Sequence, residues 1–330
     1  APGPPEPAAR ARPHVMATVI LDLTRLDANL HRLGRAAAAR SVAVRAHVKA
    51  HRTVEVALRQ VAAGAVGVAV QTAHAARRLG AAGVDDVVLA WPWPEPWRFP
   101  LFAEAAAGVP RFAVHVDRVA SVVGIGAAAT ARGTEVGVRV DLRHTPADQV
   151  VAVARAARDT PGVRFDGVAG SRPLTTASEV RDRHDLGRRY AHEVVDAAQR
   201  IRDAGVDCPV VSVGGTATLE AALQVPGVTE VCTGAYATFD GGLAEAGVCT
   251  ADDVALSVAA DATDLLDGCT QPWAPEVAWL PAGPPYEDRL VPAHVCPLAA
   301  TLVRRQVPVT VVRDGRVVAT WQPFAAPDRP

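Results

Sequence analysis

The sequence has 330 residues, of which 49% are hydrophobic, and its formal net charge is −1. A chain of this length can bury a large core in a barrel or in two domains. Its balanced charge gives no indication of a nucleic-acid partner or a membrane surface. No apolar run of about 18 residues and no signal-peptide pattern is present. We therefore expect a cytoplasmic protein that acts on a small molecule.

The five cysteines of the chain are odd in number and lack CxxC spacing, which argues against a disulfide framework. The Pro- and Ala-rich residues 1–15 are expected to form a mobile tail. Residues 16–23 contain ATVILDL, which predicts a strand, and a helix follows it. We expect this strand to pair with a second domain near the C-terminus.

From residue 42, short β-type runs alternate with longer Ala-rich helical runs. Eight strand runs are recognisable, beginning at residues 42, 65, 85, 111, 135, 163, 209 and 229. Most are spaced by about 20–28 residues, which is the length of one βα unit. The pattern predicts an α/β fold with a (β/α)8 barrel over residues 24–243.

A smaller, β-rich C-terminal domain is predicted over residues 244–330. Its expected strands and hairpins lie in VALSVAADAT at 254–263, in a Pro-rich segment at 271–285 and in VPVTVVRDGRVVATW at 307–321. The last of these contains an Asp-Gly pair between two apolar runs, which is typical of a tight hairpin turn.

Lys49 is the only lysine among 34 basic residues. A guanidinium stays protonated, whereas a lysine amine can lose its proton and attack a carbonyl to form a Schiff base. Lys49 lies at the end of the first predicted barrel strand, where barrels carry their chemistry. His47 and His51 flank it at i±2 and share its face while the chain stays extended. The alternative for both histidines is an ordinary hydrogen-bonded role.

Two glycine-containing turns follow the last two predicted barrel strands. SVGGTAT at 212–218 places Gly214 and Gly215 before a helix, and Thr216 adds a hydroxyl. CTGAY at 232–236 follows the next strand. Free backbone N–H groups at such turns bind anions, and barrels often hold phosphate there. A lysine amine facing a phosphate site is what pyridoxal phosphate needs.

A metal pair is predicted in the motif HVCP. His294 and Cys296 project to the same side if the segment is extended, and imidazole with thiolate suits zinc. Two protein ligands leave positions for water and substrate. The alternative is a buried cysteine and a hydrogen-bonded histidine.

These motifs also carry a family resemblance. The residues RAHVKAHRTVE, SVGGTAT, TEVCTGAYATFD and AHVCPLAATLV resemble the D-threonine aldolase and D-serine dehydratase family, over about residues 18–323. That family has an alanine-racemase-type barrel and uses pyridoxal 5'-phosphate (fold type III). The resemblance implies a homodimer with a Schiff base at Lys49 and a divalent metal, zinc first and manganese or magnesium as alternatives, at His294 and Cys296. The implied cofactor contacts are Lys49, His47, Ser212, Gly214, Gly215, Thr216, Gly234, Ala235 and Tyr236.

The implied activity is a metal-assisted lyase reaction on a β-hydroxy D-amino acid such as D-serine, D-threonine or a 3-hydroxyaspartate. Lys49 would remove the α-proton in a β-elimination, or a base such as His51 would drive retro-aldol cleavage. The His-x-Cys pair resembles the dehydratase branch. One alternative is a racemase, for which Tyr286 would be the tyrosine available as second base. The other is a non-catalytic cofactor-binding protein.

The sequence also departs from the family pattern. An expected arginine is replaced by Pro146 or displaced to Arg143, an expected tyrosine by Ser171, and a Glu-His-Gly element is missing. The remaining conspicuous residues are interpreted as structural. Trp91, Trp93 and Trp97 are expected to pack in a loop, and His74, His115, His184 and His192 to be surface or helix-flank residues.

Overall fold

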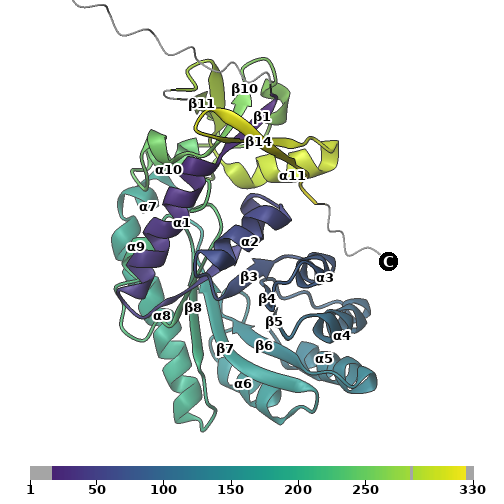
Figure 1. The fold of residues 1–330 in the computed structure, drawn as a ribbon. Coiled ribbons are helices and arrows are strands. Elements are labelled where there is room, and N and C mark those ends of the chain that lie inside the picture. Colours follow the sequence, from purple (N-terminus) through teal and green to yellow (C-terminus); the bar gives the residue numbers. More distant parts are fainter. Residues whose placement is uncertain (1–16, 283–284, 325–330) are drawn as a thin grey trace, which may run out of the picture.

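The computed structural model describes residues 17–282 and 285–324 (Figure 1). The tail predicted at residues 1–15 lies outside the described residues. Two units are visible, a barrel and a smaller sheet domain above it in the view of Figure 1.

Eight parallel strands close the barrel, and each overlaps one of the predicted runs, so the barrel prediction is confirmed. They are β2 (Ala43–His47), β3 (Gly67–Val70), β4 (Asp86–Leu89), β5 (Arg111–Val116), β6 (Val136–Asp141), β7 (Val163–Ser171), β8 (Val210–Gly214) and β9 (Glu230–Thr233). The last strand pairs with the first, with Val44 opposite Val231. Because helices cover it, the sheet is rich in buried valine, as parallel sheets generally are.

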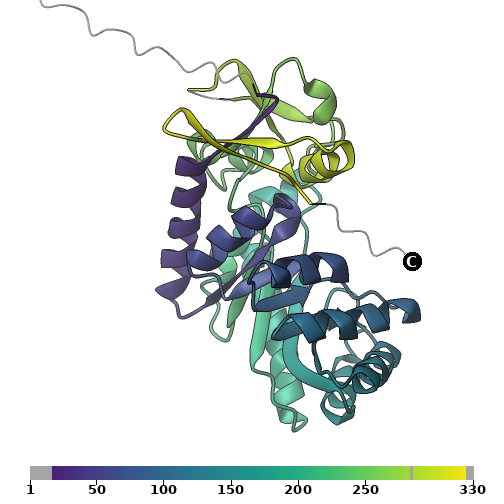
Figure 2. The same cartoon turned by 45° about the vertical axis from the view of Figure 1, so that its right-hand side comes forward.

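Helices surround the barrel, as the two views in Figures 1 and 2 show. They are α1 (Leu23–Ala38), α2 (Val54–Ala62), α3 (Ala73–Ala81), α4 (Phe99–Gly108), α5 (Val119–Arg132), α6 (Val150–Asp159), α7 (Ala177–Arg181), α8 (Arg183–Asp203), α9 (Leu219–Ala222) and α10 (Gly241–Glu245). Short 3-10 turns lie at η1 (Val48–Ala50), η2 (Pro96–Arg98), η3 (Ala251–Asp253) and η4 (Thr263–Leu265). Helix α1 begins at Asp22, whose carboxylate accepts from the N–H groups of Thr24 and Arg25.

The smaller domain contains a six-stranded mixed sheet in the order β11-β12-β10-β1-β13-β14. Its strands are β1 (Val19–Asp22), β10 (Leu256–Ala259), β11 (Trp279–Pro281), β12 (Arg289–Pro292), β13 (Val309–Arg313) and β14 (Arg316–Trp321). Ile20 of β1 lies opposite Ser257 of β10 and Thr310 of β13. The predicted pairing of the N-terminal strand with the second domain is therefore confirmed. Asp314 and Gly315 both have positive φ at the tip of the hairpin.

One local expectation for this domain is wrong. The segment after His294 is not extended, because helix α11 (Val295–Arg305) begins there. Asp240 caps this helix by accepting from the Val295 N–H at 3.1 Å, and Pro297 is tolerated because first-turn N–H groups have no helical partner. The Pro-rich segment at 271–285 contributes the strand β11, which pairs antiparallel with β12, and an isolated bridge between Gln271 and Ala274.

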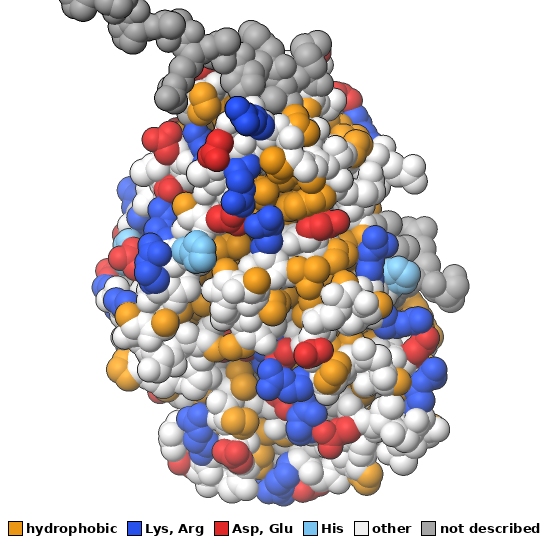
Figure 3. Space-filling view, viewed as in Figure 1, with side chains coloured by type: hydrophobic (Ala, Val, Ile, Leu, Met, Phe, Trp, Pro, Cys, Tyr) orange, Lys and Arg blue, Asp and Glu red, His pale blue; other side chains and the backbone are white. Residues whose placement is uncertain are grey.

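None of the described helices is long and apolar enough to cross a bilayer. On the face in Figure 3, acidic and basic side chains are interspersed, and apolar side chains gather in its upper half. No field of a single charge sign covers this face.

A buried ion network crosses the inside of the barrel. Glu230 on β9 accepts from Arg45 Nε on β2 at 2.8 Å and from Arg139 Nη1 on β6 at 2.6 Å. Ser212 on β8 donates to the same carboxylate at 2.8 Å, and Arg45 reaches Asp86 on β4 at 2.7 Å. Burial opposes ionisation of Glu230, but the charges of Arg139 and Arg45 outweigh it and lower its pKa to about 2.

Glu230→Gln should destabilise the fold strongly. The change leaves two buried guanidinium groups without their shared carboxylate, so we expect the free energy of unfolding to fall by roughly 3–5 kcal/mol. Because the pKa of Glu230 is about 2 when folded against an ordinary value of 4.5, its contribution is complete above about pH 4.5. It is lost as the pH falls toward 2. Urea unfolding of both proteins at pH 7 and at pH 3 measures this difference.

The matched control is Asp159→Asn, which removes an exposed partner of Arg158. We expect it to leave the unfolding midpoint unchanged. A Glu230→Gln variant as stable as this control would contradict the role given to the network.

Candidate active site

A cavity of about 310 Å³ opens at the C-terminal ends of the barrel strands and is bounded by residues of the smaller domain. It brings together most of the predicted site residues, which lie far apart in the sequence. Those that line it are His47, Lys49, Ser212, Gly214, Gly215, Thr216, Gly234, Ala235, His294 and Cys296. His51 and Tyr236 do not line it.

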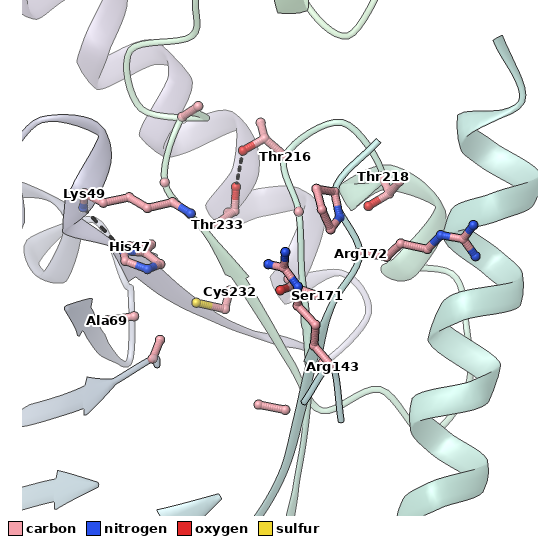
Figure 4. A pocket seen from close by; sticks show the side chains of 18 of the residues that line it. His47, Lys49, Ala69, Arg143, Ser171, Arg172, Thr216, Thr218, Cys232 and Thr233 are labelled. Atoms are coloured by element: carbon pink, nitrogen blue, oxygen red, sulfur yellow. Dashed lines mark hydrogen bonds between the residues drawn. The ribbon is translucent and has the colours of Figure 1, made fainter. Parts of the chain in front are cut away.

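Lys49 is presented to the cavity by a change in backbone direction. Strand β2 ends at His47, and the turn η1 begins at the next residue. The Lys49 N–H donates to His47 Nδ1 at 3.3 Å, which caps the turn. In Figure 4 the Lys49 side chain extends toward Thr233. Burial and then the charge of Lys49 hold the pKa of His47 well below its ordinary value, so this imidazole is neutral at pH 7.

Because of the turn η1, the His51 side chain does not lie on the same face as those of His47 and Lys49. His51 is buried, its Nδ1 accepts from the Thr53 N–H at 3.2 Å, and its Nε2 donates to Gln60 Oε1 at 3.1 Å. Burial lowers its pKa to about 4. The expectation that His47, Lys49 and His51 share one face fails, because the i±2 rule holds only in a strand.

The turns after β8 and β9 leave backbone donors free. The N–H groups of Thr216, Ala217 and Ala235 have no hydrogen-bond acceptor within the described residues. The hydroxyls of Thr216 and Thr233 bond to each other at 2.8 Å across the two turns (Figure 4). Gly215 has φ +132°, which only glycine adopts easily. Such a group of donors around a cavity suits an anion.

His294 and Cys296 line the cavity from the start of α11. His294 Nδ1 lies 3.2 Å from the Thr270 carbonyl oxygen, so its Nε2 is left for a ligand. Within the described residues no group of three or more His, Cys, Asp or Glu side chains is arranged to hold a metal ion. The donor types suit zinc, but water and substrate would have to supply its other ligands.

Three residues to which the sequence analysis assigned no functional role lie on the cavity wall. Asp141, the last residue of β6, accepts from His115 Nδ1 on β5 at 3.0 Å and from His144 Nδ1 at 2.9 Å. All three line the cavity. Burial opposes ionisation of Asp141, but the bonds from His115 and His144 outweigh it and lower its pKa. The expectation that His115 is a surface or helix-flank residue is wrong, because its side chain is only 12% exposed.

A period-two pattern could have revealed this wall. In RFAVHVD the apolar residues Phe112, Val114 and Val116 alternate with Ala113 and His115. Strand residues at alternate positions face opposite sides, so the histidine belongs to the inner face of the barrel.

Other departures from the family pattern also occupy this wall. Arg143 and Ser171 line the cavity (Figure 4), as does Arg172, whose guanidinium donates to Glu179 of α7 at 3.3 Å. Pro146 is not part of the lining.

Trp93 and Trp97 pack within their loop, as expected from the sequence. Trp93 and Trp97 place their rings 4.1 and 4.2 Å from the Arg98 guanidinium. Trp91 in addition lines the cavity and meets the ring of His144 edge-on, with centroids 5.0 Å apart.

Comparison with known proteins agrees with this geometry. Residues 21–240 match the family described as alanine racemase, N-terminal domain. The chain belongs to this family. It is 37% identical to a D-threo-3-hydroxyaspartate dehydratase of Delftia over 253 residues, covering 73% of this chain and 66% of that protein. It is 32% identical to a D-threonine aldolase of Arthrobacter over 232 residues, covering 68% and 61%. The resemblance predicted from the sequence is confirmed.

The chain spans about two thirds or less of the length of these two relatives. Among solved structures, a D-threo-3-hydroxyaspartate dehydratase in a metal-free cysteine-to-alanine variant has a TM-score of 0.77 at 27% identity, covering 94% of this chain and 97% of the other. The D-threonine aldolase of Filomicrobium marinum has a TM-score of 0.78 at 22% identity, covering 93% and 94%. The latter likeness shows the fold alone.

Gly234→Ala should perturb the turn that closes the cavity. A Cβ atom there would lie 2.6 Å from the His47 carbonyl oxygen, so the β9 turn and the end of β2 must move apart. We expect a loss of roughly 1–3 kcal/mol, measured by thermal unfolding. In the control Gly108→Ala, the new Cβ meets nothing within 4 Å at the end of a helix, and stability should be retained. Equal unfolding midpoints for both variants would contradict the close approach.

Proposed function

We propose that this member of the alanine racemase N-terminal domain family is a pyridoxal-phosphate-dependent, metal-assisted lyase acting on a β-hydroxy D-amino acid. One observation carries the proposal. The only lysine of the sequence lies in the same cavity as two donor-rich turns and a His-Cys pair. The names of the relatives, a dehydratase and an aldolase, support the same reaction class.

The residues present fit the cofactor. Lys49 supplies the amine, and the free N–H groups of Thr216, Ala217 and Ala235 with the Thr216 hydroxyl would hold the phosphate. When bound, pyridoxal phosphate acts as an electron sink for bond cleavage at Cα. Of the predicted contacts, Tyr236 is buried behind the cavity wall, and burial raises its pKa well above the ordinary value. We therefore assign it a packing role.

His294 and Cys296 would hold the metal, with zinc first and manganese or magnesium as alternatives. Solved structures of D-threo-3-hydroxyaspartate dehydratase include a histidine-to-alanine variant and the metal-free cysteine-to-alanine variant. These names support a metal site of the same residue types here. A metal at this pair would bind the β-hydroxyl of the substrate and polarise its C–O bond.

The residues of the chain then divide the work. The amine of Lys49 would take the α-proton of the substrate on its Nζ. His47 stays neutral and holds the Lys49 backbone through its Nδ1. Loss of the β-hydroxyl with the α-proton gives dehydration, whereas breaking the Cα–Cβ bond instead gives glycine and an aldehyde. The His-x-Cys pair favours dehydration, as in the dehydratase branch.

Two alternatives remain open to test. A racemase needs a second base, for which the prediction is a tyrosine of the smaller domain of a partner subunit, such as Tyr286. Within its own chain, Tyr286 donates to Asp22 Oδ2 at 3.0 Å. A non-catalytic cofactor-binding protein would keep the cofactor without turnover. The homodimer and the cytoplasmic location stay predictions.

Lys49→Arg tests the cofactor linkage. Arginine keeps the positive charge but cannot form a Schiff base, so the absorbance band of a lysine-bound cofactor should be present in reconstituted wild type and absent in the variant. Release of pyruvate from D-serine, or of glycine and an aldehyde from D-threonine, should fall to background with it. A colourless wild-type protein after reconstitution would refute the proposed function.

His294→Ala and Cys296→Ala test the metal. We expect each to lower turnover of β-hydroxy substrates at least about 100-fold while the cofactor band remains, because the metal acts on the leaving group. A chelator should have the same effect on wild type, and added zinc should reverse it. Lyase turnover that is insensitive to chelator would exclude the metal-assisted route. Inversion of the substrate without its cleavage would favour the racemase, and a bound cofactor without any turnover would favour the carrier.

A further inference from the structure

The cavity contains a hydrogen-bonded group of Asp141, His115 and His144 to which the proposed function assigns no role. An ionised carboxylate can only accept hydrogen bonds, so the bonds of Asp141 place a proton on Nδ1 of both His115 and His144. The Nε2 atom of each ring is then the one with a lone pair. His144 makes no other hydrogen bond within the described residues, and its side chain is 30% exposed at the cavity.

Two other imidazoles near the cavity are less suited to accept a proton from a ligand. His47 accepts a backbone N–H through Nδ1, so its Nε2 carries the ring proton and has no lone pair, and both ring nitrogens of His51 are hydrogen-bonded away from the cavity. His294 is a member of the proposed metal pair. This leaves His144 as the cavity histidine with a free nitrogen, greater exposure than His115 and a carboxylate behind it.

We propose that His144, oriented by Asp141, is the group that transfers the proton of the substrate's β-hydroxyl, the role that the sequence assigned to His51. The inference rests on the proposed function and adds a residue to it. Asp141 and His115 act through His144 and are positioning residues. The arrangement follows the logic of a catalytic Ser-His-Asp triad, in which a buried carboxylate fixes the tautomer of the imidazole that moves the proton.

In the two possible reactions, His144 moves a proton in opposite directions. In cleavage, Nε2 takes the hydroxyl proton, the Cα–Cβ bond breaks, and the C–O bond becomes the aldehyde carbonyl. The electron pair of the broken bond stays on the Cα fragment, which becomes glycine on protonation. In elimination, His144 starts protonated and gives its proton to the departing hydroxyl, so water leaves as Lys49 takes the α-proton.

Several charged or ring groups face this pair and would enter any pH dependence. Asp141 and the ring of Trp91 contact His144, and Arg143 precedes it in the chain. His115 faces Asp141 and lies near enough to His47 to interact with it electrostatically.

The contact itself can be tested by ligand binding. In the cofactor-loaded protein with labelled histidines, the NMR signal of His144 is assigned by its absence in His144→Gln. We expect α-methyl-D-serine, which has no α-proton and cannot undergo the elimination, to shift this signal, and formaldehyde is measured in the same sample to detect any Cα–Cβ cleavage. The matched ligand 2-aminoisobutyrate, which lacks only the hydroxyl, should not. Binding of both ligands with equal or no effect on His144 would overturn the inference while the cofactor band still upholds the proposed function.

Turnover provides the second test. His144→Ala should lower kcat at least about 100-fold with little change in KM and with the cofactor band intact, and added imidazole should restore part of the rate. Asp141→Asn should lower kcat and move its pH profile, which a purely structural role would not do. The control His192→Ala changes an exposed histidine on α8 and should leave both values unchanged. Wild-type turnover in His144→Ala, or a loss that imidazole does not relieve, would overturn the proposal.

Discussion

The carboxylate of Glu230 shared by two arginines is the interaction on which the rest of this site depends. It ties β9 to β2 and to β6 inside the barrel. Arg45 lies four residues before Lys49, Arg139 two residues before Asp141, and Glu230 four residues before Gly234. The ion network therefore fixes the register of these three strands, and with it the positions of Lys49, Asp141 and Gly234 at the cavity. An apolar interior would pack as well but would specify the strand register less sharply. A register shift would leave a charge of the network buried and unpaired, and this costs far more free energy than moving a valine to a new apolar position.

Much of the fold could be predicted from the sequence because its signals are periodic and local. The eight β runs, the spacing of one βα unit and the Asp-Gly hairpin all correspond to elements of the structure. Even the long-range pairing of β1 could be expected, because an isolated apolar strand must find a sheet. The glycine turns and Lys49 lie together for the same reason, since strand ends of a barrel converge on one face.

The rest of the site could not be predicted because it depends on where a regular element stops. A 3-10 turn after His47 turns His51 away from the cavity, and helix α11, whose Val295 N–H donates to Asp240, contains Cys296 in place of the expected strand. The first event has a local cap at His47, and the second a tertiary contact with Asp240. The wall of His115 and His144 carries only a partial sequence signal. The alternation in RFAVHVD indicates that His115 faces the inside of the barrel, but His144 lies in the turn after β6 and is linked to His115 only through the carboxylate of Asp141.

The position of β1 has a consequence for assembly. The first strand of the described chain lies between β10 and β13, so its neighbours in the sheet are more than 230 residues away in sequence. During synthesis the barrel strands emerge in order and can pair in turn, but β1 must wait with its edges unpaired until almost the whole chain exists. Contacts of such long sequence separation form late, because the entropy of closing the loop must be overcome first. The half of the cavity that carries His294 is thus the last to be built, after the barrel that carries Lys49.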